Sequence, residues 1–480
     1  MIVFQDTQDL QYLQSIMEKD AQKSRFIQQY LKPLLHSGLG RILKNIKSKG
    51  FGVLSIIQFL ACLPLMGLYT IGGIFPSEYA NFVLCKKDTF YRLKNNANIP
   101  WRKIMASITR RFLSLCAKHT TPQIQDKKSS PSCFIFDDTD LSKTGEKIEG
   151  VSRIWSHVNH AYSLGFKGLF FGLWDGKSFL PTNFSLHREK GTKSDKPFGL
   201  TRKKIAQQFS KIRTENQAGY QRKEELDKKK TDMVVEMMQY AISQGIKADF
   251  ALCDSWFFCF NLLHFVTQKG MTLVSGVKIG KINFEYNGKN YSPKSLLNIH
   301  KGKAKFCRKL KMHYIPLVVR YKGIEIRLFF VRYANQSKWR IIMNSDAKMP
   351  FIKTMEIYQI RWSIEVFFKE AKQYLGLAKC QSNDFDAHIA HISMVCVLFM
   401  ALALKKRVDC QETIGGLFRH AKVEMNEKTL AHKMWLLFCR IVQNLTDFFD
   451  FEPKELIKKL FDDTLSKKFI RLFDNTPLLE

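Results

Sequence analysis

Residues 134–140 read FIFDDTD, a run of apolar side chains that gives way abruptly to Asp137 and Asp138. Its aromatic and β-branched residues favour a short buried strand that ends at the two carboxylates. ALCDSWF at 251–257 repeats the pattern and places Asp254 at the end of a second strand. Open sheets expose crevices at the ends of strands. A carboxylate at such a position is costly to leave unpaired, so it needs a cation, a metal or a helix N-terminus.

Two longer apolar runs lie between these strands. The pattern predicts strands in both runs, YSLGFKGLFFGLW at 162–174 and SFLPTNFSLH at 178–187. Between them, Asp175-Gly176 predicts a hairpin turn. A long basic helical segment, 203–245, comes next along the chain. Hairpin strands followed by a helix and another strand are typical of a mixed α/β sheet. We therefore predict an α/β fold in which helices flank a mixed sheet.

A second strand-rich stretch covers about 270–345, where Asn287-Gly288 and Lys322-Gly323 mark further hairpins. This stretch reads as a β-rich insertion into the α/β fold, because helical patterns resume after it and continue to the C-terminus.

A third carboxylate lies in a helical pattern, IYQIRWSIEVFFKEAKQYL at 357–375. Tyr358, Arg361, Glu365 and Lys372 are separated by three, four and seven residues. These steps return to one face of an α-helix. Taken alone, the pattern also suits an ion-paired surface helix.

Three converging carboxylates would bind a divalent ion that prefers oxygen ligands, Mg²⁺ or Mn²⁺. Two such ions ~3.5–4 Å apart can activate a water or a 3′-hydroxyl and stabilise the leaving oxygen of a phosphoryl transfer. Cations on Arg361 and Lys372 would hold the phosphates of the substrate beside these ions.

These blocks resemble the insertion-sequence transposases whose DDE catalytic domain carries a Tyr-Arg-Glu-Lys signature. The signature is complete as Tyr358, Arg361, Glu365 and Lys372, and the DDT at 137–139 and the ALCDSWF block are also similar. The resemblance covers about residues 130–385, with the β-rich insertion between the second and third blocks. It implies an RNase H-like catalytic domain that uses two Mg²⁺ (or Mn²⁺) ions per active site.

The resemblance assigns the catalytic and metal-binding carboxylates to Asp138, which precedes a threonine, Asp254 and Glu365. Asp137 competes with Asp138 for the first position, because alternation along the strand does not say which of them faces the metal. Asp249 competes more weakly with Asp254.

The same resemblance implies that Tyr358, Arg361 and Lys372 bind DNA phosphates near the cleavage site. In relatives that form a DNA hairpin, a tryptophan late in the β insertion stacks on a flipped base. Trp339 is the candidate here, and a tryptophan in the core of a strand is the alternative.

Charge supports a nucleic-acid partner. The 480 residues contain 76 Lys and Arg against 43 Asp and Glu, a formal net charge of +33. An excess of this size attracts polyanions, although solvated lysines also contribute to such a count, as the run 228–230 illustrates. Two short basic helical patterns around 95–100 fit a helix-turn-helix, in which Arg92 and Lys94 would contact DNA.

The segment from Phe51 to Phe75 has no charged residue and is long enough to span a bilayer. Pro64 and Gly67 break it into shorter pieces that are better suited to a buried helical core, so no membrane is expected. Eleven cysteines without a CxxC pair and an acidic N-terminus without a signal-peptide pattern favour the cytoplasm, near the nucleoid of a bacterial cell.

The predicted function is a DNA transposase that cuts the terminal inverted repeats of its element and joins the 3′-hydroxyl ends to target DNA, as a homodimer in the synaptic complex. An RNase H-like nuclease without strand transfer and an inactive transposase that only binds DNA are the alternatives. The predicted regions are a helical DNA-binding region (1–125), the first part of the catalytic domain (126–265), the β-rich insertion (266–348), the last part of the catalytic domain (349–390) and a helical C-terminal region (391–480).

Overall fold

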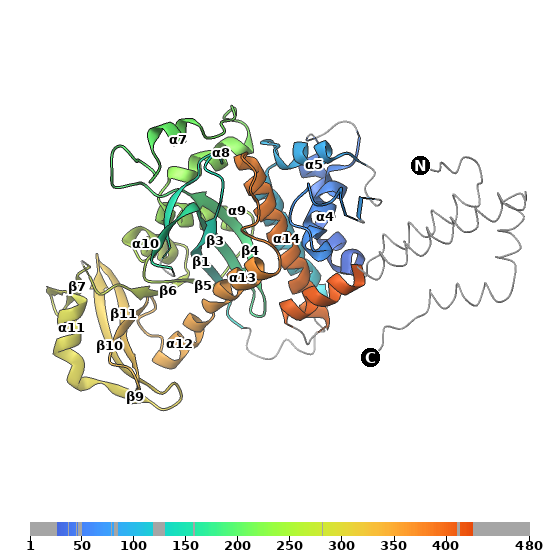
Figure 1. Ribbon diagram of the computed structural model, residues 1–480. Coiled ribbons are helices and arrows are strands. Elements are labelled where there is room, and N and C mark those ends of the chain that lie inside the picture. The colour runs from blue at the N-terminus through green and yellow to red at the C-terminus, as the bar shows by residue number, and fades with distance from the viewer. Residues whose placement is uncertain are drawn as a thin grey trace, which may run out of the picture. The chain divides into compact units, whose positions relative to one another are not determined.

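The computed structural model describes residues 26–36, 38–44, 46, 50–77, 79–80, 85–118, 130–156, 159–280, 282–409 and 413–425. The chain divides into two compact units, one formed by Met1–Gln29 with Arg419–Glu480 and the other by Tyr30–Phe418. The residues described in the first unit, 26–29 and 419–425, are helical. The described strands all lie in Tyr30–Phe418 (Figure 1).

Among the described residues, twelve strands form one mixed sheet. Its order is β2-β3-β1-β5-β6-β12-β11-β10-β7-β8, with β4 paired to β3 and β9 paired to β10. The strands are β1 (Cys133–Ser142), β2 (Ser152–Ser156), β3 (Ala161–Trp174), β4 (Phe179–His187), β5 (Phe250–Cys253), β6 (Thr272–Val277), β7 (Phe284–Tyr286), β8 (Lys289–Tyr291), β9 (Lys305–Cys307), β10 (Met312–Tyr321), β11 (Ile324–Tyr333) and β12 (Arg340–Asn344).

Strand direction confirms the predicted fold class. β1 pairs antiparallel with β3 and parallel with β5, and β5 pairs parallel with β6. The strand β2, which the sequence pattern did not indicate, pairs antiparallel with β3. A mixed sheet with helices around it is α/β and compatible with the RNase H-like fold that the resemblance implies.

The β-rich insertion continues this sheet. β12 pairs antiparallel with β6, and β11 and β10 follow it in the sheet order. The predicted hairpins at Asn287-Gly288 and Lys322-Gly323 are confirmed, because they join β7 to β8 and β10 to β11. Lys322 and Gly323 have φ of +48° and +87°, as a two-residue type I′ hairpin turn requires.

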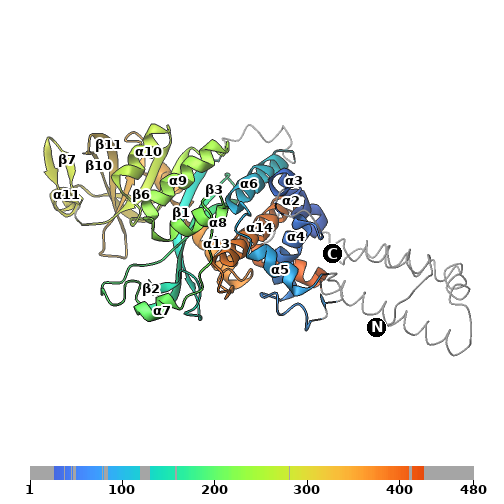
Figure 2. The ribbon, with the colours of Figure 1, turned by 90° about the horizontal axis from the view of Figure 1, so that it is seen from above.

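Helices cover both faces of the core strands. The described helices include α2 (Lys32–Leu35), α3 (Leu39–Leu43), α4 (Val53–Cys62), α5 (Lys87–Lys94), α6 (Trp101–Lys118), α7 (Arg202–Ala206), α8 (Ala218–Glu224), α9 (Lys230–Ser243), α10 (Phe260–Gln268), α11 (Pro293–His300), α12 (Phe351–Gln359), α13 (Trp362–Gln373) and α14 (Phe385–Asp409), with a π-helix at Ile27–Leu31 and short 3₁₀ turns at Leu63–Met66, Glu225–Asp227 and Lys301–Lys303. Residues 414–425 are also helical. On one face, Phe170 of β3 packs against Phe367 and Phe368 of α13. On the other, α9 contacts β3 and β4 and packs against α10 (Figure 2).

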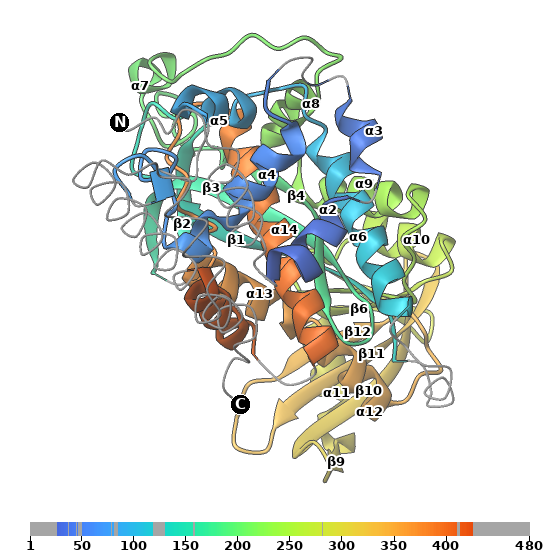
Figure 3. The ribbon, with the colours of Figure 1, turned by 90° about the vertical axis from the view of Figure 1, so that its right-hand side faces the viewer.

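The uncharged segment 51–75 forms short buried pieces, as predicted. α4 leads into the 3₁₀ turn Leu63–Met66, which ends at Gly67 with φ of +73°. Most of α4 is buried, and it contacts α14 (Figure 3).

One described helix is long and apolar enough to cross a membrane by length and composition, α14 over Phe385–Val408. Within the protein 94% of that window is buried, and α14 contacts α6, α4 and β4. The core helix of a globular domain has the same character, so this helix is weak evidence for a span.

Candidate catalytic site

The carboxylates of β1 lie where its neighbouring strand has already ended. β5 pairs only with Cys133–Ile135 of β1, and Asp254 follows the last residue of β5. Asp254 is therefore at a strand end, as predicted. Asp137 and Asp138 are within β1 instead, because pairing with β3 carries this strand on to Ser142. On the β5 side, the described residues pair no strand with Asp137 or Asp138.

Alternation along β1 sends the two neighbouring carboxylates to opposite faces of the sheet. Asp137 faces α13, where its Oδ2 accepts a hydrogen bond from Arg361 Nη1 at 3.2 Å. Asp138 faces α9, where its carboxylate forms an ion pair with the ammonium of Lys230. Of the two candidates for the first catalytic aspartate, only Asp137 therefore lies on the sheet face that is covered by α13, the helix that carries Glu365.

Asp137 is held among other carboxylates with little access to water. Burial is the largest cause that raises the pKa of Asp137 to about 7. The neighbouring carboxylates of Asp254 and Asp138 also raise this pKa, whereas Arg361 lowers it. Its side chain is only 17% exposed. A concentration of negative charge of this kind creates a strong local demand for a cation.

Arg361 supplies a cation between Asp137, the competing candidate for the first position, and the predicted catalytic Glu365. Its Nη2 donates to Glu365 Oε1 at 2.6 Å, while Nη1 donates to Asp137. Arg361 is 15% exposed and Glu365 is 32% exposed, so the bridge lies at the edge of the site. The guanidinium thus links the signature helix α13 to β1.

The signature residues do not lie on one continuous helix. α12 ends at Gln359 and α13 begins at Trp362, so the prediction of a single helical stripe is wrong at this point. Tight turns join the two helices, with Ile360 N–H donating to Ile357 O and Arg361 N–H donating to Tyr358 O. The turns keep Tyr358 beside Arg361, whose guanidinium carbon lies 5.8 Å from the centre of the tyrosine ring.

Tyr358 and Lys372 stand at opposite ends of the signature. Burial raises the pKa of Tyr358 to about 12, so its hydroxyl stays protonated and can donate a hydrogen bond. Lys372, one residue from the end of α13, donates from Nζ to Thr139 Oγ1 at 2.7 Å. Thr139 is two residues after Asp137 on β1, so Lys372 and Arg361 contact the same face of this strand.

The donor chemistry of this face suits a divalent ion. Asp137, Asp254 and Glu365 offer the carboxylate oxygens that Mg²⁺ and Mn²⁺ prefer. Among the described residues, no group of three His, Cys, Asp or Glu side chains is already gathered closely enough to hold a metal. The guanidinium of Arg361 lies between Asp137 and Glu365, so all three carboxylates would meet at one ion only after Arg361 exchanges a partner.

The remaining predicted DNA contacts lie away from these carboxylates. Trp339 is in the connection between β11 and β12, partly exposed, with the Arg332 guanidinium carbon 5.3 Å from its ring centre. It is not in the core of a strand, which was the alternative reading. Arg92 is exposed on α5.

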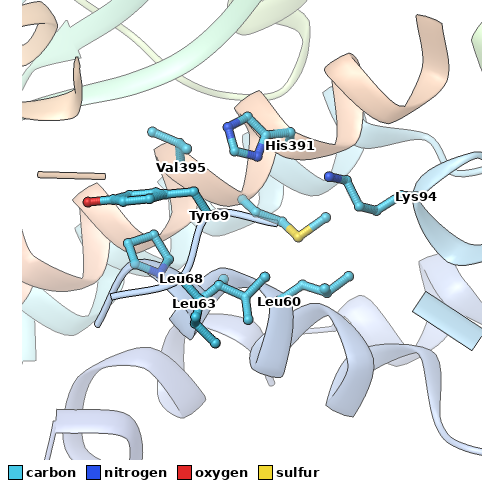
Figure 4. Close-up of a pocket in the computed structure, with 10 residues that line it drawn as sticks. Leu60, Leu63, Leu68, Tyr69, Lys94, His391 and Val395 are labelled. Atoms are coloured by element: carbon cyan, nitrogen blue, oxygen red, sulfur yellow. The ribbon is translucent and has the colours of Figure 1, made fainter. Parts of the chain in front are cut away.

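Lys94 points into the helical core. Its Nζ lies 3.9 Å from Cys380 Sγ, and it lines a small cavity with His391 and Leu60 (Figure 4). This position suits a structural contact better than a phosphate contact. The two helices predicted around 95–100 are present as α5 and α6.

The longer of these two helices, α6, is part of the core. It packs against α14 and β4, and its Arg102 forms an ion pair with the buried Glu225 at 2.7 Å. Among the described basic side chains of this pair, Lys87, Arg92, Lys103 and Arg110 are exposed. A phosphate-binding surface here would use these residues. α6 is packed too deeply in the core for its whole length to enter a DNA groove.

Two side chains beside the carboxylates were not predicted as functional residues. Lys230 pairs with Asp138, and its ammonium lies 4.1 Å from the ring centre of Trp256. Lys230 belongs to a lysine run whose sequence predicts a solvated helix face, with phosphate contact as the alternative. Trp256 stands inside the quoted ALCDSWF block, where only Asp254 was singled out.

Residues 84–284 match the family model described as DDE superfamily endonuclease. No curated protein matches the chain significantly. The matched range contains Asp137, Asp138 and Asp254. The matched range ends before Tyr358, Arg361, Glu365 and Lys372. Arg361 and Lys372 contact β1 through Asp137 and Thr139.

Proposed function

Because the chain belongs to a DDE transposase-type family and carries a DDE endonuclease domain, with DNA as the implied substrate, we propose that it is a DNA transposase. It would cut the terminal inverted repeats of its own element and join the freed 3′-hydroxyl ends to target DNA. The observation that carries the proposal is that Arg361 joins Asp137 to Glu365, with Asp254 near Asp137 and Lys372 on the same strand face.

Asp137, Asp254 and Glu365 are the residues that would hold the Mg²⁺ or Mn²⁺ ions, with Asp137 in the position first assigned to Asp138. Bound there, two ions would activate the attacking water or 3′-hydroxyl and stabilise the leaving oxygen of an in-line displacement. Glu365 lies in the first turn of α13, a position where the helix dipole favours a carboxylate.

Arg361 and Lys372 would bind the phosphates on either side of the scissile bond. A phosphate entering the site can replace a carboxylate as the partner of the Arg361 guanidinium, since both accept two parallel hydrogen bonds from it. This exchange would free Glu365 or Asp137 to bind a metal ion. Tyr358, which keeps its proton, would donate a hydrogen bond to a phosphate oxygen.

The excess of basic residues supports DNA as the partner, and exposed Arg92 on α5 belongs to the proposed end-binding surface. Two copies of the chain would pair the two ends of the element in a synaptic complex. The proposed location is the nucleoid in the cytoplasm of a bacterial cell.

Strand transfer distinguishes this proposal from a nuclease that only cuts. We expect the wild-type chain, incubated with Mg²⁺, labelled DNA bearing the inverted repeats that flank the gene, and a supercoiled plasmid, to give labelled ends covalently joined to plasmid. Joining needs a 3′-hydroxyl, so ends made with a 3′-dideoxy nucleotide are the matched control. Cut ends without joined product would favour the nuclease, and an absence of both would favour a protein that only binds DNA.

A further inference from the structure

A partly exposed indole lies beside Asp254, one of the proposed catalytic carboxylates. Trp256 is 42% exposed and follows Asp254 by two residues. Its backbone N–H donates to Asp254 Oδ1 at 2.8 Å, so the position of this tryptophan is tied to that of the carboxylate. The ring packs edge-on against buried Phe257, with 4.9 Å between ring centres.

A lysine is held between this indole and a carboxylate. Lys230 Nζ lies 4.1 Å from the centre of the Trp256 ring and is also paired with the Asp138 carboxylate. The side chains of Lys230 and Asp138 are 15% and 26% exposed. Three elements, β1, the start of α9 and the turn after β5, therefore bring a carboxylate, a cation and an aromatic face together.

We propose that Trp256 and Lys230 form a subsite for the nucleotide next to the scissile phosphate, in which the indole stacks on an unpaired base and the ammonium pairs with the adjoining phosphate. An aromatic face beside a cation is the usual means of binding single-stranded nucleic acid. The subsite rests on the proposed function, because it needs a DNA strand at Asp137, Asp254 and Glu365. Asp138 is then a positioning residue that holds Lys230 toward the DNA.

The geometry favours a base over a protein side chain as the occupant. Trp256 is tied to Asp254, and Lys230 lies on the α9 face of β1, opposite Arg361 and Lys372. A DNA strand that crosses the end of β5 would therefore meet a cation for its phosphates on each face. Stacking on an aromatic ring contributes about 1–3 kcal/mol per base by alanine substitution. A fully paired base would keep its faces within the duplex and leave the indole without a partner.

The test uses 2-aminopurine placed singly at positions across the cleavage site, with the full chain bound in the absence of divalent metal. We expect wild-type binding to quench the fluorescence at one or two positions beside the scissile phosphate. Trp256→Ala should lose that quenching and Trp256→Phe should keep most of it. Phe306→Ala is the matched control, since Phe306 is 50% exposed on β9 of the insertion.

Lys230→Met gives an independent measurement, because loss of one phosphate contact should reduce the salt dependence of DNA binding by about one unit of log–log slope. The inference is overturned if Trp256→Ala shows wild-type quenching at every position, or if the wild type shows no quenching. Wild-type nicking with Mg²⁺ is measured in parallel. Absent nicking overturns the proposed function, whereas nicking with unchanged quenching in Trp256→Ala overturns only the subsite.

Discussion

Asp137→Asn should slow Mg²⁺-dependent cleavage of DNA ends by about 10³-fold or more, while Asp138→Asn should slow it by at most about tenfold. Asp137 shares its face of β1 with Arg361 and lies near Asp254, so its loss removes a proposed metal ligand. Asp138 is turned toward Lys230 on the other face, and its loss releases one partly exposed ion pair. The measurement is the single-turnover cleavage rate at saturating protein.

Both substitutions keep the shape of the side chain, so DNA binding without divalent metal should be close to that of wild type. Asp249→Asn is the matched control, because Asp249 precedes β5 and accepts hydrogen bonds from Ser132 rather than facing the site. If Asp138→Asn instead slowed cleavage by about 10³-fold while Asp137→Asn kept its activity, the assignment would be contradicted. Asp138 would then be restored as the first ligand.

A second large effect is expected at a buried ion cluster around Arg213. Its guanidinium donates to both oxygens of Glu149, at 2.8 and 2.7 Å, and to Asp386 Oδ2 at 3.0 Å. The side chains of Arg213, Glu149 and Asp386 are 3%, 4% and 5% exposed. The cluster connects the loop after α7 to the first turn of α14, with Lys211 also bound to Asp386 at 2.8 Å.

Arg213→Met should lower the free energy of unfolding by about 3–5 kcal/mol, because it leaves two carboxylates buried without their main partner. Denaturation of the full chain by urea measures this change. Lys204→Met is the matched control, since Lys204 forms an exposed pair with Glu146 at 2.8 Å and should contribute about 0–1 kcal/mol. A loss for Arg213→Met no larger than that of the control would show that Arg213 does not stabilise the fold.

Local patterns were enough to predict much of the fold. The strands at 162–174 and 178–187 and the hairpins at Asn287-Gly288 and Lys322-Gly323 depend on residues close together in the chain, and they were confirmed. The strand end at Asp254 was predicted for the same reason. β2 was missed because Ser152–Ser156 carries only two apolar side chains in five residues.

The orientation of side chains between elements could not be predicted in this way. Asp137 and Asp138 are adjacent in one strand, and only the packing of α13 on one face and α9 on the other distinguishes their roles. The partners Lys230 and Asp138 are 92 residues apart, and Arg213 and Asp386 are 173 apart. Local periodicity does not indicate ion pairs between residues so far apart in the sequence. For this reason the lysine run at 228–230 was interpreted as a solvated helix face, with phosphate contact as the alternative.

The break between α12 and α13 has a different cause. The spacing of Tyr358, Arg361 and Glu365 fits an unbroken helix, yet the turn at Ile360 and Arg361 directs the guanidinium to Asp137. Tertiary contacts across the site therefore override a regular local pattern. The position of the Lys94 side chain could not be predicted either, because a basic helical pattern does not indicate that this ammonium lies against Cys380.

Counting bound Mn²⁺ by electron paramagnetic resonance tests the central claim, that Asp137, Asp254 and Glu365 form one divalent metal site. We expect the full chain bound to DNA ends to hold two Mn²⁺ ions per chain at saturation. The double variant Asp137→Asn/Glu365→Gln should bind the same DNA but hold neither ion, while Asp249→Asn should hold both. Two ions retained in the double variant would contradict the claim.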